Sequence, residues 1–138
     1  MTSGFNTVFS QDVFQAPENF SHARVLDNGL VYASAQIPLD TNGKIVGTTI
    51  EEQTEQVLKS HEAILIAAGS SLKNILRINV YLVEPSDYSG FSEIYSKFAN
   101  VVIVKMIPNP KPPRGCIFVK ALPAGAKVEM DLVAIVGA

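Results

Sequence analysis

Cysteine and charged residues are both scarce in this sequence. The first shortage excludes an internal disulfide, and the second argues against a surface that is fully exposed to water. Cys116 is the single cysteine among 138 residues, so no disulfide can form within the chain. A chain without disulfides fits a reducing compartment. Asp, Glu, Lys and Arg make up 17% of the residues, whereas about 25% is typical. Because a small domain exposes much of its chain, this shortage indicates that a partner covers part of its surface.

The sequence also lacks a segment that would direct it to a membrane or to nucleic acid. No apolar run approaches the roughly 20 residues of a membrane-spanning helix, so the covered surface is expected at a subunit interface. A net charge of −2 gives little attraction to nucleic acid or acidic lipid. The first 20 residues contain no Lys or Arg and resemble no secretory or mitochondrial leader. We expect a cytoplasmic protein, with a mitochondrial location left open.

Motifs of the common metal and nucleophile enzymes are missing too. His22 and His61 lie far apart and have no neighbouring cysteine, so no metal site is predicted. No glycine-rich phosphate loop and no Gly-x-Ser-x-Gly motif occurs. These absences disfavour the usual nucleophilic and cofactor-dependent enzymes.

Turn signals and apolar periodicity predict a single α+β domain over residues 1–138. Asn28-Gly29 is a strong hairpin signal. Thr49 and Glu52 form a capping box for a helix that Gly69 ends. The predicted order is β-β-α-β-α-β-β. We expect irregular structure over 1–22 and helices over 49–68 and from 85 onward. Strands are expected over 24–27, 30–36, 75–83, 116–121 and 128–136. The segment 101–113 should start like a strand and end as a rigid, proline-rich loop.

Two of these elements have a distinct apolar face. The predicted apolar face of the strand over 75–83 consists of Leu76, Ile78, Val80 and Leu82. The predicted stripe of the second helix consists of Phe91, Ile94, Tyr95 and Phe98. Two helices cover one face of a mixed sheet, yet residues 116–119 form a continuous apolar run, typical of a strand buried on both faces. We therefore expect the chain to self-associate through the other face.

Arg114 is the first candidate for chemistry. It follows Pro112-Pro113 and precedes the apolar strand, a position suited to binding a carboxylate through two parallel N–H···O bonds. The alternative is a surface arginine at a strand end. Cys116 follows by two residues and shares its face, as a wall of the site or as a reactive thiol. A free cysteine is more often a small buried apolar residue, and no paired histidine supports a nucleophile.

Glu129 is the second candidate. It lies in a strand that is otherwise nearly apolar, where parity places it with Asp131 on the face opposite Met130 and Leu132. A carboxylate there could orient water or relay a proton. It could equally be an edge-strand charge that prevents aggregation.

Three separated motifs resemble those of the Rid (YjgF-like, endoribonuclease L-PSP) family, in the same order and from about residue 16 to the C-terminus. Ser34 to Pro38 reads Ser-Ala-Gln-Ile-Pro, where the family has Ser-Gly-Gln-[Ile/Val]-Pro. Residues 67–75 read Ala-Ala-Gly-Ser-Ser-Leu-Lys-Asn-Ile and match a second motif. Residues 112–123 and 128–135 resemble the C-terminal signature built around Pro-Ala-Arg-[Ser/Thr] and [Val/Leu]-Glu-[Ile/Met].

The resemblance implies a chorismate-mutase-like fold with two helices on one face of a mixed sheet, assembled as a homotrimer with sites between subunits. It implies a cofactor-independent 2-iminobutanoate/2-iminopropanoate deaminase, which hydrolyses 2-imino or 2-enamino acids to 2-keto acids and ammonia. Arg114 matches the family arginine that binds the substrate carboxylate, and Glu129 the acidic residue near the attacking water. Cys116 matches a cysteine of the site wall, and Ser34 and Ala35 match the pair that lines the pocket.

Four features depart from the family pattern. Phe20 replaces a tyrosine whose hydroxyl faces the site, and Ser92 replaces an asparagine of the second helix. Gly115 replaces a hydroxyl residue, and the segment 99–113 is longer than usual. Two other functions stay open: a non-catalytic trimer that binds small carboxylates or protein partners, and a ribonuclease or translation inhibitor. Few and scattered basic residues give the nucleic-acid role little support.

Overall fold

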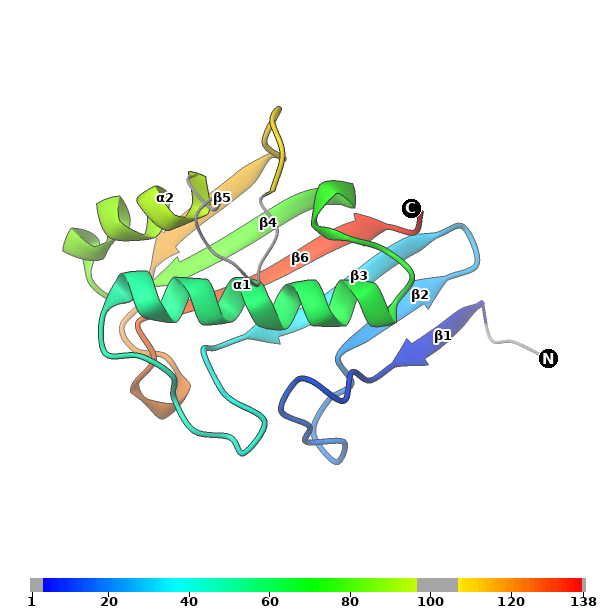
Figure 1. Cartoon of the computed structure of the whole chain (residues 1–138), viewed down its shortest axis with the longest axis horizontal. Helices are drawn as coiled ribbons and strands as arrows, with labels where there is room; N and C mark the ends of the chain where they lie inside the picture. The colour runs from blue at the N-terminus through cyan, green and yellow to red at the C-terminus, as the bar shows by residue number, and fades with distance from the viewer. Residues whose placement is uncertain (1–3, 97–106, 138) are drawn as a thin grey trace.

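A six-stranded mixed sheet, with both α-helices on one of its faces, forms the computed structural model (Figure 1), which describes residues 4–96 and 107–137. The strand order is β1-β2-β3-β6-β4-β5, with β4 and β5 parallel and all other neighbours antiparallel. The expected α+β class is confirmed. The elements are β1 (Phe5–Val8), β2 (Ala23–Leu26), β3 (Leu30–Gln36), α1 (Ile50–Ala67), β4 (Ile75–Leu82), α2 (Tyr88–Ser96), β5 (Arg114–Phe118) and β6 (Val128–Ile135), with short 3₁₀ turns at Leu72–Asn74, Pro85–Asp87 and Pro123–Gly125.

The prediction of irregular structure over 1–22 is wrong at β1. This strand has four residues and pairs with β2 at the edge of the sheet, and its sequence is too short to show a clear alternation. The buried imidazole of His22 stabilises the segment between β1 and β2. Its Nδ1 accepts a hydrogen bond from the Ser10 N–H (2.9 Å), and its Nε2 donates to the Phe14 carbonyl (2.7 Å).

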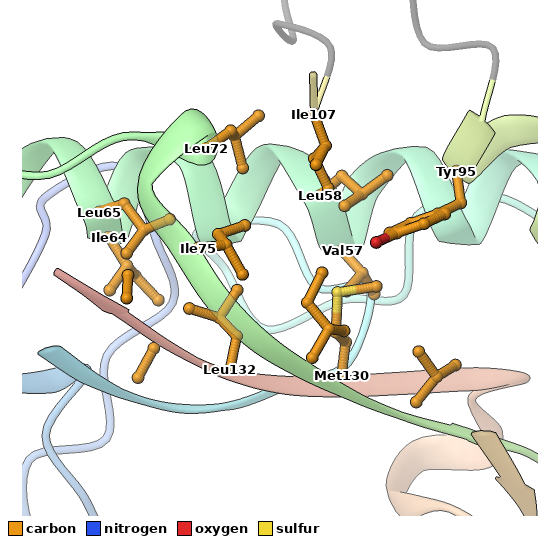
Figure 2. Close-up of a cluster of buried hydrophobic side chains, with 14 of the residues drawn as sticks. Val57, Leu58, Ile64, Leu65, Leu72, Ile75, Tyr95, Ile107, Met130 and Leu132 are labelled. Atoms are coloured by element: carbon orange, nitrogen blue, oxygen red, sulfur yellow. The ribbon is translucent and has the colours of Figure 1, made fainter. Parts of the chain in front are cut away.

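Helix α1 begins as the capping box predicts. The Thr49 hydroxyl accepts a hydrogen bond from the Glu52 N–H, and the Glu52 carboxylate accepts one from the Thr49 N–H, each at 3.1 Å. Gly69, at φ +79°, follows the helix as predicted. Figure 2 shows the apolar side of α1 meeting side chains from β4 and β6, which together form the core: Val57, Leu58, Ile64, Leu65, Ile75, Met130 and Leu132.

The predicted apolar face of β4 is correct at three positions and wrong at Leu76. Ile78, Val80 and Leu82 are buried, whereas Leu76 is 42% exposed and Ile75 is buried in its place. The pairing of β4 with β6 shifts register between Ile75 and Arg77, which reverses the alternation there. On α2, Phe91 and Tyr95 are buried and Ile94 is partly buried. Phe98 and the first part of the 101–113 prediction lie outside the described residues.

Strand β5 is an edge strand, so the expected burial on both faces is wrong for the single chain. It pairs with β4 alone among the described strands, and Ile117 and Phe118 are 55% and 47% exposed. Ile117 pairs with Tyr81 on the face that the helices leave open. Tyr32 and Ile135, on the same open face, are also exposed. These exposed apolar side chains on an uncovered face agree with the reason for expecting self-association, which stays a prediction.

Candidate functional site

Arg114 is the first residue of β5 and points to the helix side of the sheet. It pairs in parallel register with the buried Ile78. Its Nη2 donates a hydrogen bond to the Tyr88 hydroxyl (2.8 Å). Its Cζ lies 5.7, 5.4 and 4.9 Å from the ring centroids of Tyr88, Phe91 and Tyr95. Rings at this distance attract a guanidinium and fix its orientation.

All three rings come from α2, at helical spacing. Phe91 and Tyr95 belong to the predicted stripe, but the prediction missed Tyr88. The signal was present, because Tyr88 lies three residues before Phe91 and seven before Tyr95, on the same side of the helix. The stripe thus serves two purposes: part of it fills the core, and part of it forms an aromatic wall for Arg114.

A hollow of about 320 Å³ opens beside Arg114. Its lining joins the end of α2 to the proline-rich segment before β5 and consists of Ser92, Tyr95, Ser96, Lys111, Pro112 and Arg114. The structure therefore brings two predicted site residues, Arg114 and Ser92, into one cavity. The Ser92 hydroxyl is buried and has no hydrogen-bond partner within the described part of the chain. One arginine N–H is used by Tyr88, and a guanidinium has five N–H donors, so further donors can serve a ligand.

Cys116 lies two residues along β5 on the same side and packs against the core. Burial raises the pKa of its thiol, and the positive charge of Arg114 offsets part of this effect. A thiol with a raised pKa is a poor nucleophile. This environment favours the role of a wall over that of a reactive group.

Glu129 lies on the opposite, open face of the sheet. It pairs with Tyr81. Partial burial raises the pKa of its carboxyl, and the neighbouring Asp131 charge raises it further. Asp131 accepts hydrogen bonds from Asn79 Nδ2 (2.8 Å) and the Tyr81 hydroxyl (3.0 Å). The predicted parity of Glu129 and Asp131 against Met130 and Leu132 is confirmed.

Phe20, Ser34 and Ala35 lie on the β1–β3 side of the sheet, away from β5. Ser34 lines a separate hollow of about 250 Å³ with residues of β2 and β3. Ala35 lies where the pairing of β3 with β6 shifts register, and Phe20 is 38% exposed beside the His22 ring. Strands β6 and β4 separate β3 from β5, which places β3 about 14 Å from β5. Within one chain, the predicted site residues therefore form three groups.

Both histidines have structural roles in the part of the chain that the structure describes. His61 is fully buried on α1, and its Nε2 donates to the Met130 carbonyl (2.6 Å). Burial lowers the pKa of His61 to about 4. Within residues 4–96 and 107–137, no three His, Cys, Asp or Glu side chains gather as metal ligands would. No described helix is long and apolar enough to span a membrane.

Residues 10–136 match the sequence profile of the family described as Endoribonuclease L-PSP. The chain belongs to this family. The Rid resemblance drawn from the three motifs is thus confirmed. Protein mmf1, mitochondrial, of Schizosaccharomyces pombe is 35% identical over 111 residues, which are 78% of this chain and 63% of mmf1. Reactive Intermediate Deaminase A, chloroplastic, of Arabidopsis thaliana is 35% identical over 108 residues, 78% of this chain and 54% of that protein.

This chain therefore spans less than two thirds of either of these relatives. Among solved structures, E. coli TdcF with bound serine has a TM-score of 0.81 at 25% identity. The match covers 96% of this chain and 99% of the TdcF chain. The expected Rid fold, a mixed sheet with two helices on one face, is confirmed by this likeness.

Proposed function

We propose that this Rid protein hydrolyses 2-imino and 2-enamino acids to 2-keto acids and ammonia. The observation that carries the proposal is the guanidinium of Arg114. It is oriented by three α2 rings and has N–H donors available beside a small hollow. A planar guanidinium held in this way suits a carboxylate. The name of the Arabidopsis relative and the serine bound to TdcF support a small substrate of the amino-acid type.

The reaction requires few catalytic groups from the protein. The C2 carbon of an imine is already electrophilic, so holding the substrate beside a water molecule gives most of the catalysis. Arg114 binds the C1 carboxylate while the oxygen of water bonds to C2. Glu129 accepts a proton from that water and returns it to the nitrogen, which gives a carbinolamine. Glu129 then moves the hydroxyl proton to the nitrogen as the C2–O bond becomes a carbonyl and the C–N bond breaks, so that ammonia leaves a 2-keto acid. A carboxyl with a raised pKa, as at Glu129, suits a group that both accepts and donates a proton.

A second copy of the chain completes the site. Arg114 and Cys116 lie on the helix side of β5, whereas Glu129 lies on the open face and Phe20, Ser34 and Ala35 near β3. These residues can surround one small molecule when the β5 edge of the sheet in one copy meets the open face of the sheet in a second copy. A homotrimer, as the family resemblance implies, provides such a junction and also covers the exposed apolar side chains of the open face.

A reducing compartment is the expected location. Cys116 is the one cysteine, and its thiol is half-buried rather than paired. The names of the two relatives include mitochondrial and chloroplastic. We favour the cytoplasm for this chain and keep a mitochondrial location open.

The direct test is the loss of 2-iminopropionate and 2-iminobutyrate, generated in situ by an amino-acid oxidase. The wild-type protein should accelerate imine loss. Arg114→Ala should abolish the acceleration, and Arg114→Lys should retain a small part, because lysine keeps the charge but loses the two-pronged donor. Lys73→Ala, which removes an exposed cation on the turn before β4, should match the wild type.

Two results would contradict the proposal. If the wild type does not accelerate imine loss but binds 2-ketobutyrate through Arg114, the protein is a carboxylate-binding member of the family. If Arg114→Ala is as active as the wild type, the carboxylate is bound elsewhere.

A further inference from the structure

The hollow beside Arg114 contains a second cation that the proposed reaction does not use. Lys111, from the proline-rich segment before β5, lines this hollow together with Arg114. Its Nζ lies 5.7 Å from the Tyr95 ring centroid, and Arg114 Cζ lies 4.9 Å from the same centroid. Two cations therefore lie against one aromatic ring in one small cavity.

Lys111 is held in place from the core side. Its Nζ donates a hydrogen bond to the backbone carbonyl of Ile107, whose side chain is fully buried in the hydrophobic core (Figure 2). An ammonium has three donors, so this contact leaves donors for a ligand. Partial burial lowers the pKa of Lys111, which reflects the cost of taking the charge out of water.

The described lining of the hollow offers these cations no carboxylate. Among the residues that the structure describes there, none is Asp or Glu. The buried Ser92 hydroxyl, also in the lining, lacks a hydrogen-bond partner there and can donate to an anionic oxygen. Partly desolvated cations that lack a carboxylate are stabilised when an anion binds.

We propose that this protein selects 2-imino acids that carry a second carboxylate. Arg114 binds the C1 carboxylate and Lys111 binds the distal one, with the Ser92 hydroxyl beside them. Within one chain the hollow has a volume of about 320 Å³, which is at the small end of ligand sites and suits a short chain of roughly four or five carbons. The inference rests on the proposed function, because it names the substrate class of that same site.

Binding of two stable keto acids tests this selectivity without requiring turnover. By isothermal titration calorimetry, 2-ketoglutarate should bind the wild-type protein about tenfold more tightly than 2-ketobutyrate, a difference of about 1.4 kcal/mol. Lys111→Met should bring the two affinities close together by weakening 2-ketoglutarate alone. Lys44→Met, the matched loss of one positive charge in the exposed turn over 40–44, should preserve the preference.

The inference is overturned if the wild type binds both keto acids equally or binds neither, or if Lys111→Met keeps the tenfold preference. The imine assay distinguishes this failure from failure of the proposed function. Hydrolysis of 2-iminobutyrate without a dicarboxylate preference contradicts the selectivity alone. A Lys111-dependent preference without any imine hydrolysis supports the selectivity and contradicts the deaminase.

Discussion

Arg114 and Glu129 point to opposite faces of the same sheet. Arg114 pairs with Ile78, which faces the helices, and Glu129 pairs with Tyr81, which faces away from them. Strand β4 lies between the two strands that carry them. Because side chains on opposite faces are separated by the sheet itself, one small molecule cannot contact both within one chain. A site that uses both residues must be built from two copies.

Tyr88 is predicted to position Arg114 rather than to stabilise the fold. Tyr88→Phe removes the hydroxyl that accepts the Nη2 hydrogen bond and keeps the ring. We expect the KM for 2-iminobutyrate to rise several-fold, since a hydrogen bond to a charged group contributes about 1.5–3 kcal/mol when fully formed and less at an exposed site. The melting temperature should stay within about 1 °C of the wild type, because the side chain is 41% exposed. An unchanged KM would show that the rings alone orient the guanidinium.

The stability of the protein should depend on His61 in mildly acidic solution. The folded pKa is about 4, below the ordinary value of 6.5, so the unfolded chain binds the proton more readily. This contribution to stability is therefore present above pH 6.5 and is lost as the pH falls from 6.5 toward 4, by up to about 3 kcal/mol. Urea unfolding at several pH values measures it.

His61→Gln is the matched variant, because its amide can still donate to the Met130 carbonyl but does not titrate. The variant should show a smaller loss of stability between pH 6.5 and pH 4 than the wild type. Parallel pH profiles for the two proteins would contradict the assignment of a buried neutral imidazole.

Gly90 is predicted to set the close approach of α2 to α1. A Cβ at this position would lie 2.6 Å from Ile50 Cγ2 and 2.6 Å from Glu51 Oε2. Glu51 can move aside, but the Ile50 side chain is buried. Gly90→Ala should therefore lower the free energy of unfolding by about 1 kcal/mol, because overpacking outweighs the helix propensity gained. Ser89→Ala, at the exposed neighbouring position, should cost nothing; equal effects of the two changes would contradict the close contact.

Local signals in the sequence predicted much of the fold. The Asn28-Gly29 turn and the Thr49–Glu52 capping box each depend on a few adjacent residues, and both are present in the structure. Strand β1 and the exposure of Leu76 were not predictable in this way. The first depends on pairing with β2, and the second on a register shift against β6.

Candidate site residues could be chosen from the sequence one by one, but their arrangement in space could not be predicted. Arg114 and Glu129 stand out by residue type and position, and Tyr88 could have been found from helical spacing. The separation of Arg114 from Glu129 follows from β5 pairing in parallel with β4 while β6 pairs on the other side of β4. Such an order is decided by contacts between distant segments, which neither periodicity nor turn chemistry encodes.

Mixing two inactive variants tests the shared site most directly. Arg114→Ala and Glu129→Gln, each inactive alone, are unfolded together in equal amounts, refolded, and assayed for loss of 2-iminobutyrate. If each site takes Arg114 from one subunit and Glu129 from another, about a quarter of the sites in randomly mixed oligomers contain both intact residues. We predict about a quarter of the activity of wild-type protein refolded in the same way. Activity no higher than that of the separate variants would contradict a site built from two copies of the chain.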